Sequence, residues 1–337
     1  MKTVILAAGF GSRLWPLSTS DKPKQFQPLI HGQSLVAYTY QTMAHVIPND
    51  SLYVLTLEGL EHFVLEQIPG ISADYILSVP ARRNTLPHTL WALNILADEP
   101  VLFRSVDHFL PDPTAFVASL KSCIERYEAG ASDFTLLCTE NSPYSANDGY
   151  ALLSEPSNIS QFIEKPIPAE YSALQAKGKL LRSPFIYIAT NKSAAQILGG
   201  LDYDWARLGI QLLGSDADNK KQLFLDMPVM DISTSVFQES QNLKADVIDY
   251  EFVDVGTYSA LYALNEKDAA GNVLIGDIIT GTDCFDNFIV NQTSNPVVVQ
   301  GISSSIVILT NQGNLVSSFS TVDAVGEIYK QNIHARK

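Results

Sequence analysis

The sequence predicts an α/β fold, with a mostly parallel sheet covered by helices on both faces and a small β module at the C-terminal end. Two patterns carry this prediction. Up to about residue 265, short β-branched runs alternate with segments of helical periodicity, as crossover-connected strands require. Beyond that point, brief Val/Ile runs are separated by Gly, Asn, Asp and Ser. A chain of 337 residues exceeds what one hydrophobic core usually fills, so we expect two domains, residues 1–265 and 266–337.

The elements of the first domain follow from local patterns. Short apolar runs predict buried strands at 3–8, 52–56, 75–79, 101–106 and 133–139. Residues 35–46 repeat apolar side chains at helical spacing, which predicts a helix between the first two strands. A second helix is expected to begin near Asn84 or Thr85, with Pro87 in its first turn. A third is expected from Asp112-Pro113 to about Glu128. A strand-like run at 246–253 comes late in the domain.

The second domain contains no helical period until its end. Its apolar runs predict strands at 273–275, 288–290, 297–299, 306–309 and 315–319. Short strands with close turn signals are typical of a small all-β module. One form of it is a solenoid, a left-handed β-helix-like stack, although the sequence has no clean hexapeptide repeat. A β face or edge of this module could be shared between protomers, so we expect a homodimer.

Charge and cysteine usage exclude several classes of protein. The chain has 22 basic and 36 acidic residues, a net charge of −14, and no Lys/Arg-rich run, so we expect neither a nucleic-acid nor a membrane partner. Its 3 Cys are far apart, which is neither a disulfide framework nor a zinc site and fits a reducing cytoplasm. The N-terminal apolar run, Val4 to Ala8, is too short for a signal peptide or a membrane span. We therefore expect a cytoplasmic protein.

A glycine-rich loop directly follows the first strand. Gly9-Phe10-Gly11-Ser12-Arg13-Leu14 lets backbone N–H groups approach phosphate oxygens, and Lys24 follows shortly in Pro23-Lys24-Gln25-Phe26. Arg13 and Lys24 would neutralise a nucleoside triphosphate, and as loop residues they are expected to be solvated. The loop is not a dinucleotide fingerprint, which needs a glycine where Leu14 stands, and no Gly-Lys-Ser/Thr P-loop is present. An ordinary tight turn is the alternative for the loop taken alone.

Two aspartates are candidate metal ligands. Asp107 follows the strand at 101–106, and the carboxyl ends of strands are where open α/β sheets bind ligands. Asp254 follows the strand-like run at 246–253, with Gly256 just beyond it. Mg²⁺ takes one or two protein carboxylates and shares its shell with phosphate oxygens and water. The alternative for each aspartate is a helix cap.

Several short motifs, taken in their order along the chain, resemble those of the sugar-1-phosphate nucleotidyltransferases. The first motif is Leu6 to Ser18, followed by Pro23-Lys24-Gln25-Phe26. Within it, Trp-Pro-Leu-Ser and Pro-Lys-Gln-Phe resemble the motifs of the mannose-1-phosphate guanylyltransferase branch. The others are residues 80–87, Ser105-Val106-Asp107-His108, Glu164-Lys165-Pro166 and residues 252–258. The resemblance spans residues 3 to about 264, and the C-terminal β segment of the branch resembles residues 271 onward.

The resemblance implies transfer of GMP from GTP to mannose 1-phosphate, with release of pyrophosphate and with Mg²⁺ or Mn²⁺ as cofactor. The sugar phosphate is itself the nucleophile, so no Ser or Cys nucleophile is expected. Catalytic roles fall on Arg13, Lys24 and Asp107, and metal binding on Asp107 and Asp254. The expected nucleotide-binding residues are Leu6, Ala8, Gly9, Gly11, Ser12, Arg13, Lys24, Arg83 and Asn84. The expected sugar-phosphate-binding residues are Gly149, Glu164, Lys165 and Arg182, with Glu164 accepting sugar hydroxyls and Lys165 reaching the phosphate. For Glu164 and Lys165, the alternative is a surface ion pair.

Three segments depart from the branch, all in its sugar-binding half. Thr-Gly-Tyr-Gly-Tyr is replaced by Ala146-Asn147-Asp148-Gly149-Tyr150, and Trp-Asn-Ser-Gly by Leu181-Arg182-Ser183-Pro184. The Asp of Ser-Ile-Asp-Tyr-Ala is replaced by Ser233. Arg182 cannot accept a hydrogen bond, but it could contact a phosphate or another anionic group. Two alternatives therefore stay open: the same chemistry on another sugar 1-phosphate or nucleotide, and a catalytically weak regulatory protein that binds nucleotide sugars.

Overall fold

The structure, a computed structural model, describes residues 1–97, 99–130, 134–140, 143–154 and 157–332. Within these ranges, no helix combines the length and the apolar character needed to cross a bilayer. The chain forms two compact units, and each is built from several segments. Unit 1 contains Met1–Ala8, Thr39–Val106 and Leu110–Phe252. Unit 2 contains Gly9–Tyr38, Asp107–Phe109 and Val253–Lys337, so the glycine-rich loop shares a unit with the C-terminal strands. Whether residues 266–337 fold as a domain of their own stays a prediction.

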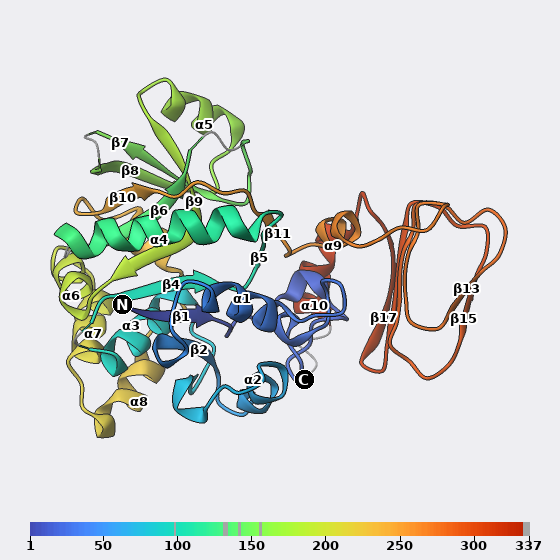
Figure 1. Cartoon of the computed structure of the whole chain (residues 1–337), viewed down its shortest axis with the longest axis horizontal. Helices are drawn as coiled ribbons and strands as arrows, with labels where there is room; N and C mark the ends of the chain where they lie inside the picture. Colours follow the sequence, from blue (N-terminus) through green and yellow to red (C-terminus); the bar gives the residue numbers. More distant parts are fainter. Residues whose placement is uncertain (98, 131–133, 141–142, 155–156, 333–337) are drawn as a thin grey trace. The chain divides into compact units, whose positions relative to one another are not determined.

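Unit 1 is organised by a 9-stranded sheet, visible in Figure 1, whose main path runs β10-β6-β9-β4-β1-β2-β3. Its strands are β1 (Lys2–Leu6), β2 (Leu52–Leu57), β3 (Ile76–Val79), β4 (Val101–Ser105), β6 (Thr135–Thr139), β7 (Gly149–Leu153), β8 (Ile159–Glu164), β9 (Leu180–Ala189) and β10 (Lys244–Val247). The strands β3, β2, β1 and β4 are mutually parallel, as are β6 and β10. The long strand β9 runs antiparallel to β4, β6 and β7, and β7 pairs antiparallel with β8.

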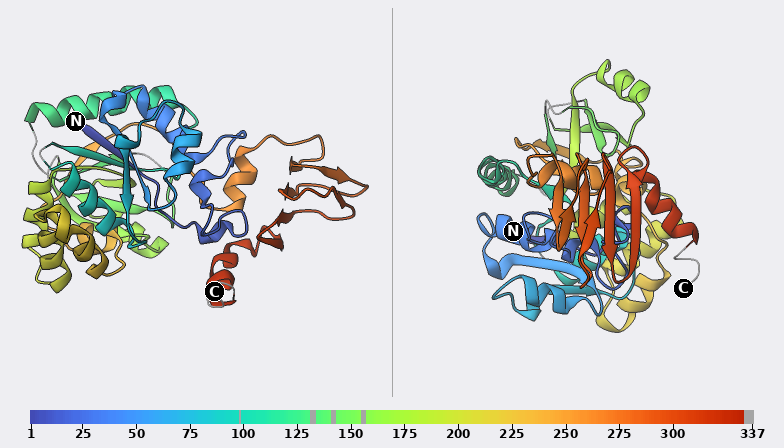
Figure 2. Two further views of the ribbon diagram at one scale, coloured as in Figure 1. Left: turned by 90° about the horizontal axis from the view of Figure 1, so that it is seen from below. Right: turned by 90° about the vertical axis from the view of Figure 1, so that its right-hand side faces the viewer.

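Helices cover both faces of this sheet, because its strands carry apolar side chains on alternate sides. On one face, Val4 and Phe103 pack in a core with α3, α6, α7 and α8. On the other, Arg104 contacts Met43 of α1 and lies 4.4 Å over the Phe116 ring of α4. The left view of Figure 2 shows these two helical layers with the sheet between them. The helices are α1 (Leu35–Ala44), α2 (Glu61–Gln67), α3 (Thr85–Ile95), α4 (Pro113–Gly130), α5 (Pro168–Gln175), α6 (Asn191–Gly199), α7 (Asp204–Leu213) and α8 (Ala217–Asp226).

Unit 2 joins the loop region to a stack of short strands. The antiparallel pair β5 (His108–Phe109) and β11 (Val253–Asp254) lies beside the helix α9 (Tyr258–Leu264) in sequence. Two sets of C-terminal strands follow, β12-β14-β16-β17 and β13-β15. Their bounds are β12 (Val273–Ile275), β13 (Ile278–Thr280), β14 (Phe288–Asn291), β15 (Val297–Val299), β16 (Ser305–Thr310) and β17 (Gly313–Ser318). The helix α10 (Val325–Asn332) ends the described chain.

The C-terminal strands stack as successive parallel coils, which the right view of Figure 2 shows side by side. Only β17 is antiparallel, paired with β16. A buried asparagine ladder links the coils: Asn272 Oδ1 accepts from the Asn287 N–H at 3.0 Å, and Asn287 Oδ1 accepts from the Ser305 N–H at 3.0 Å. Such a ladder satisfies backbone donors at the turns between strands. The parallel coils are the arrangement of a solenoid, and the left-handed sense stays a prediction.

The structure confirms the predicted fold class, including the parallel sheet with helices on both faces and the C-terminal strands. The cap of α3 is the expected one, since Asn84 Oδ1 accepts from the Thr85 N–H at 2.8 Å. The single run expected at 246–253 is wrong. It contains the end of β10, which pairs with β6, and the start of β11, which pairs with β5. The strand β13, which is only 3 residues long, was not expected, and neither were β7, β8 and β9.

Candidate active site

The glycine-rich loop of unit 2 is held in place by hydrogen bonds within its own length. Ser18 Oγ donates to the Phe10 carbonyl at 2.5 Å and accepts from the Lys24 N–H at 2.9 Å. The Gln25 amide donates to the Gly9 carbonyl at 3.1 Å. The Gly9–Leu14 loop and the Pro23–Phe26 segment, both singled out in the sequence, are therefore held against one another. A loop fixed in this way presents its backbone N–H groups without reorganisation when an anion binds.

Two aromatic residues from the end of the chain support the same loop. The Tyr258 hydroxyl of α9 lies 2.9 Å from the carbonyl oxygens of both Leu14 and Trp15. Tyr329 of α10 is buried, and its ring lies 5.6 Å from that of Phe10 and 5.7 Å from that of Trp15. Neither contact was predicted from the sequence, because each joins segments more than two hundred residues apart.

Lys24 is buried against Gly11. Its side chain is only 7% exposed, whereas that of Arg13 is 45% exposed, so the expectation of solvated loop cations holds for Arg13 and is wrong for Lys24. A Cβ atom added to Gly11 would lie 2.6 Å from Lys24 Cδ, and the Gly11 φ of +70° is in the left-handed region. Glycine at position 11 therefore supplies both the turn and the space that the Lys24 side chain occupies.

Lys24 and Asp107 form an ion pair, with 2.9 Å between Nζ and Oδ2. Burial alone would raise the pKa of the Asp107 carboxyl, but the charge and hydrogen bond of Lys24, together with His108 and Arg13, hold that pKa below its ordinary value. The carboxylate is therefore ionised at neutral pH and is 32% exposed. A charged, partly exposed oxygen is the state required of a metal ligand.

Asp254 lies on β11, directly paired with the strand that follows Asp107. The Val255 N–H donates to the Asp107 carbonyl at 2.8 Å, which brings the two aspartates to neighbouring positions of one strand pair. Asp254 Oδ1 accepts from the Gly256 N–H at 2.8 Å, and Oδ2 lies 3.9 Å from an Arg13 Nη2. A Cβ atom at Gly256 would be 2.7 Å from that same nitrogen, so glycine leaves room for the Arg13 guanidinium in this position.

The donor set of Asp107 and Asp254 fits a magnesium or manganese ion. Two carboxylates on adjacent strands, each partly exposed, provide the small number of protein oxygens that Mg²⁺ uses when phosphates and water complete its shell. Among the residues that the structure describes, no group of three or more His, Cys, Asp or Glu could hold a metal by itself. A metal ion held by Asp107 and Asp254 would therefore need further ligands from outside these two side chains, such as phosphate oxygens and water.

A second group of predicted residues gathers in unit 1, at the end of β8. Glu164 is 14% exposed, and its Oε1 lies 2.9 Å from Lys165 Nζ. Burial raises the pKa of Glu164 above its ordinary value against the opposing charge of Lys165, and the Asp231 and Asp148 carboxylates add to the rise. Gly149 leaves room for this carboxylate, since a Cβ atom there would be 2.8 Å from Glu164 Oε2. Lys165 has a φ of 51°, a strained backbone conformation of the kind that clusters at functional sites.

Asp148 and Arg182, two residues that differ from the branch pattern, form an ion pair with each other. Arg182 of β9 donates to Asp148 Oδ2 through Nε at 2.8 Å and through Nη2 at 2.5 Å. The two side chains are only 13% and 9% exposed, and the guanidinium lies 4.2 Å from the centre of the Phe252 ring. The register of β7 with β9, which places Tyr150 opposite Arg182, brings the two segments together. Arg182 is thus neutralised within the protein.

Sequence reasoning missed two residues that surround Glu164. Asp231 accepts a hydrogen bond from Thr85 Oγ1 at 3.1 Å and from the Ser233 N–H at 2.9 Å, and its charge acts on Glu164. The branch pattern has an Asp at the position of Ser233, so the sequence suggested that a carboxylate is lost there. The structure shows that Asp231 supplies a carboxylate two positions earlier. Gln238 Oε1 accepts from the Glu164 N–H at 3.0 Å. Only the packing of β8 against the segment around residues 233–237 could have revealed these contacts.

The remaining predicted nucleotide-binding residues lie in separate places in unit 1. Leu6 and Ala8 are buried at the end of β1, directly before the loop. Asn84 caps α3 with a φ of 66°, and Arg83 donates from Nη2 to the Leu225 carbonyl at 2.6 Å. The structure gives Arg83 and Asn84 structural contacts, and their nucleotide-binding role stays a prediction.

Comparisons with known proteins establish the family. Residues 2–271 match the family described as Nucleotidyl transferase. The chain belongs to this family. It is 30% identical, over 96% of its length and 73% of the relative's, to a Vibrio cholerae protein provisionally named a mannose-1-phosphate guanylyltransferase. It is 28% identical to mannose-1-phosphate guanylyltransferase RfbM of Salmonella typhimurium, over 96% of this chain and 71% of the relative.

A solved structure shows the same fold over nearly the whole nucleotidyltransferase. The structure titled mannose-1-phosphate geranyltransferase from Thermus thermophilus superposes with a TM-score of 0.80 at 22% identity, covering 98% of both chains. This match includes the C-terminal strands, so the stacked β module is part of the shared architecture. The predicted resemblance to the mannose-1-phosphate guanylyltransferase branch is confirmed, and the chain is a sugar-phosphate nucleotidyltransferase.

Proposed function

We propose that this nucleotidyltransferase transfers GMP from GTP to mannose 1-phosphate, giving GDP-mannose and pyrophosphate. The observation that carries the proposal is the pairing of Lys24 with Asp107 and of Arg13 with Asp254 in one unit. These pairs place two cations and two carboxylates around a phosphate-binding loop. The names of the curated relatives, mannose-1-phosphate guanylyltransferases, support the choice of guanine and mannose.

In the proposed reaction, a phosphate oxygen of the sugar 1-phosphate attacks the α-phosphorus of GTP in line. The new P–O bond forms as the bond to pyrophosphate breaks, so no proton has to leave the nucleophile. Lys24 and Arg13 would neutralise charge on the triphosphate, and the loop amides would position it. A bound Mg²⁺ or Mn²⁺, held by Asp107 and Asp254, would supply charge neutralisation between the two anions. Lys24 would have to shift from Asp107 toward phosphate, as the local exchange of one anionic partner for another.

The sugar half of the proposal rests on Glu164 and its neighbours. An acceptor carboxylate at Glu164 can receive two sugar hydroxyls, and Lys165 supplies the ammonium for the sugar phosphate. The Asp148–Arg182 pair takes the place of the neutral Tyr and Asn of the branch pattern. This difference favours a second candidate, the same chemistry on another hexose 1-phosphate. We propose that GTP is selected more strictly than the sugar, with glucose 1-phosphate used within about two orders of magnitude of mannose 1-phosphate.

The catalytically weak regulatory protein is disfavoured by the same site. A binding protein has no need for two ion pairs around the phosphate loop, yet Arg13, Lys24, Asp107 and Asp254 are all present and brought together. We also propose a homodimer formed through the C-terminal strands. Ile279 of β13 and Val298 of β15 are register partners and are 55% and 69% exposed, which leaves an apolar face on that module.

Pyrophosphate release measured over a panel of nucleoside triphosphates and hexose 1-phosphates tests the proposal. We expect GTP with mannose 1-phosphate to give the largest kcat/KM and to require Mg²⁺ or Mn²⁺. Asp107→Asn and Asp254→Asn should each lower kcat/KM at least about 100-fold. Asp277→Asn, which alters a carboxylate of the C-terminal strands, is the matched control and should leave turnover unchanged. Near-normal turnover of either site variant at saturating metal would show that the aspartate only caps its neighbouring backbone.

A further inference from the structure

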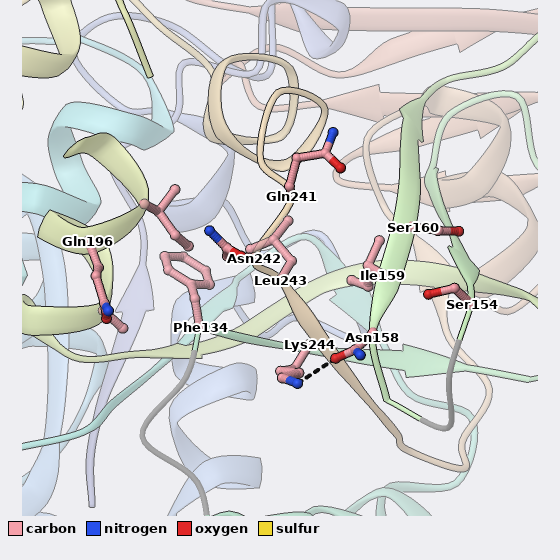
Figure 3. A pocket seen from close by; sticks show the side chains of 12 residues that line it. Phe134, Ser154, Asn158, Ile159, Ser160, Gln196, Gln241, Asn242, Leu243 and Lys244 are labelled. Atoms are coloured by element: carbon pink, nitrogen blue, oxygen red, sulfur yellow. Dashed lines mark hydrogen bonds between the residues drawn. The ribbon is translucent and has the colours of Figure 1, made fainter. Parts of the chain in front are cut away.

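A polar cavity of about 630 Å³ lies in unit 1, and neither Glu164 nor Arg182 belongs to its lining. Figure 3 shows side chains that line it from several elements: Gln196 from α6, Ser160 from β8, Ser154 from the residue after β7, and Gln241 and Asn242 from the segment before β10. Its remaining lining consists of Phe134, Asn158, Ile159, Ser193, Ile197, Leu243 and Lys244.

The cavity lies at the opposite end of the strands from Glu164 and Arg182. It opens where β6, β8 and β10 begin, at Phe134, Ile159 and Lys244. Glu164 is the last residue of β8, and Arg182 of β9 pairs with Thr139, the last residue of β6. At about 3.3 Å per residue, the length of β8 separates the cavity from Glu164 by roughly 16 Å. The cavity is therefore a separate site within the same unit.

The lining has the chemistry of a site for a hydroxyl-rich monophosphate. The side-chain amides of Gln196, Gln241 and Asn242 make no hydrogen bond to another described residue, and amides of this kind can pair with vicinal hydroxyls. Lys244 Nζ donates to Asn158 Oδ1, as the dashed line in Figure 3 marks, and an ammonium has two further donors. Among the described residues, no carboxylate lies within ion-pair distance of Lys244, and the described part of the lining contains no acid. One cation suits one phosphate group, whereas a triphosphate would need several.

The cavity is connected to the sugar half through hydrogen bonds at both ends of β8. At the cavity, the Ile159 N–H donates to the Leu243 carbonyl at 3.0 Å. At the other end, the Glu164 N–H donates to Gln238 Oε1 at 3.0 Å. Residues 238–244 are one short stretch of chain, so a ligand that moves Gln241 or Lys244 acts on the residue that holds Glu164.

We propose that this cavity is an effector site for a singly phosphorylated hexose, which alters the affinity of the enzyme for its sugar 1-phosphate. Binding of the hexose phosphate to the cavity does not depend on the proposed function. The effect of that binding on the enzyme rests on the proposed function. The class is set by the lining: hydroxyls for the amides, one phosphate for Lys244, and a volume within the range of small-molecule sites.

Isothermal titration with mannose 6-phosphate, glucose 6-phosphate and fructose 6-phosphate tests the binding. We expect at least one to bind the full chain, and Lys244→Met and Gln241→Ala each to weaken it about 10-fold or more, the scale of one lost charged or bidentate contact. Lys221→Met, which removes an exposed lysine of α8 paired with Glu58, should bind as the wild type does. Lys165→Met should also retain binding, because it alters only the sugar half. Gln196→Ala provides a further lining variant should Lys244→Met fail to fold.

The effector role is tested by the KM for the sugar 1-phosphate that the enzyme uses. Saturation of the cavity should change that KM at least about five-fold, and Gln241→Ala should remove the change. Absence of binding by all three phosphates at millimolar concentration would overturn the site. Binding that survives Lys244→Met and Gln241→Ala but is lost in Lys165→Met would place the ligand in the sugar half instead. Binding at the cavity with an unchanged KM would overturn the effector role, and failure of turnover alone would count against the proposed function only.

Discussion

Breaking the Asp148–Arg182 pair should destabilise unit 1 far more than breaking a surface ion pair does. Asp148→Asn keeps the size of the side chain but leaves the Arg182 guanidinium buried without a counter-charge. Removing one partner of a buried pair costs about 3–5 kcal/mol. Because the two side chains retain 9% and 13% exposure, the lower figure applies. A loss of about 3 kcal/mol corresponds to a fall in Tm of roughly 6–12 °C for a unit of this size.

The double variant Asp148→Asn/Arg182→Met separates the charge from the packing. It removes both charges and keeps an apolar chain beside Phe252, so we expect it to lose only about 1 kcal/mol relative to the wild type. Glu140→Gln breaks the half-exposed Lys179–Glu140 pair and is the matched control, with an expected loss of at most about 1 kcal/mol.

Thermal unfolding by circular dichroism and urea denaturation of these variants and of the single variant Arg182→Met gives the coupling energy between the two residues. The kcat/KM for mannose 1-phosphate and glucose 1-phosphate should be measured on the same proteins, since the pair lies beside Glu164. A single variant as stable as Glu140→Gln would refute the buried-charge reasoning. A double variant less stable than both single variants would show that the pair stabilises the fold outright.

Three further predictions concern other parts of the chain. Burial lowers the pKa of His88 to about 4, so the unfolded chain takes up a proton at this residue before the folded chain does as the pH falls. The free energy of unfolding should therefore drop by up to about 3 kcal/mol between about pH 6.5 and 4. Urea denaturation should show a smaller drop than in the wild type for His88→Phe, and the wild-type drop for His62→Gln. Gly11→Ala and Gly32→Ala both place alanine at positive φ, at +70° and +76°, but only Gly11 is packed against Lys24. Gly32→Ala should lose about 1 kcal/mol of stability, and Gly11→Ala should lose more because its Cβ atom meets the buried Lys24 side chain. Only Gly11→Ala should lower kcat/KM, by about 10-fold or more. Sedimentation should show a dimer at micromolar concentration and a monomer for Val298→Asp; a monomeric wild type with full activity would contradict the homodimer.

The sequence determined the fold class and many of the secondary-structure elements because its signals are local. Runs of β-branched residues, the Asn84 cap and the proline of α4 each act within a few residues, and the strands and helices they predict are present. The order of the motif words, from Gly9 to Gly256, likewise identified the family. The loop and Asp107 could be proposed because each follows a recognisable strand. Lys24 was proposed from its position shortly after the loop, and Asp254 from a run that the structure divides between β10 and β11.

Tertiary structure alone decided which of these residues meet and in what state. Burial of Lys24 follows from Gly11 and Ser18, and the support of the loop by Tyr258 and Tyr329 joins the two ends of the chain. Arg182 was expected to be open to an anion, but the register of β7 and β9 places Asp148 beside it. Strand pairing and burial depend on contacts between segments that are distant in the sequence. They decide which charged side chain pairs with which, and how much free energy the burial of each charge costs. The sequence shows which residues are charged, and only the tertiary structure determines which of these charges are neutralised by a partner.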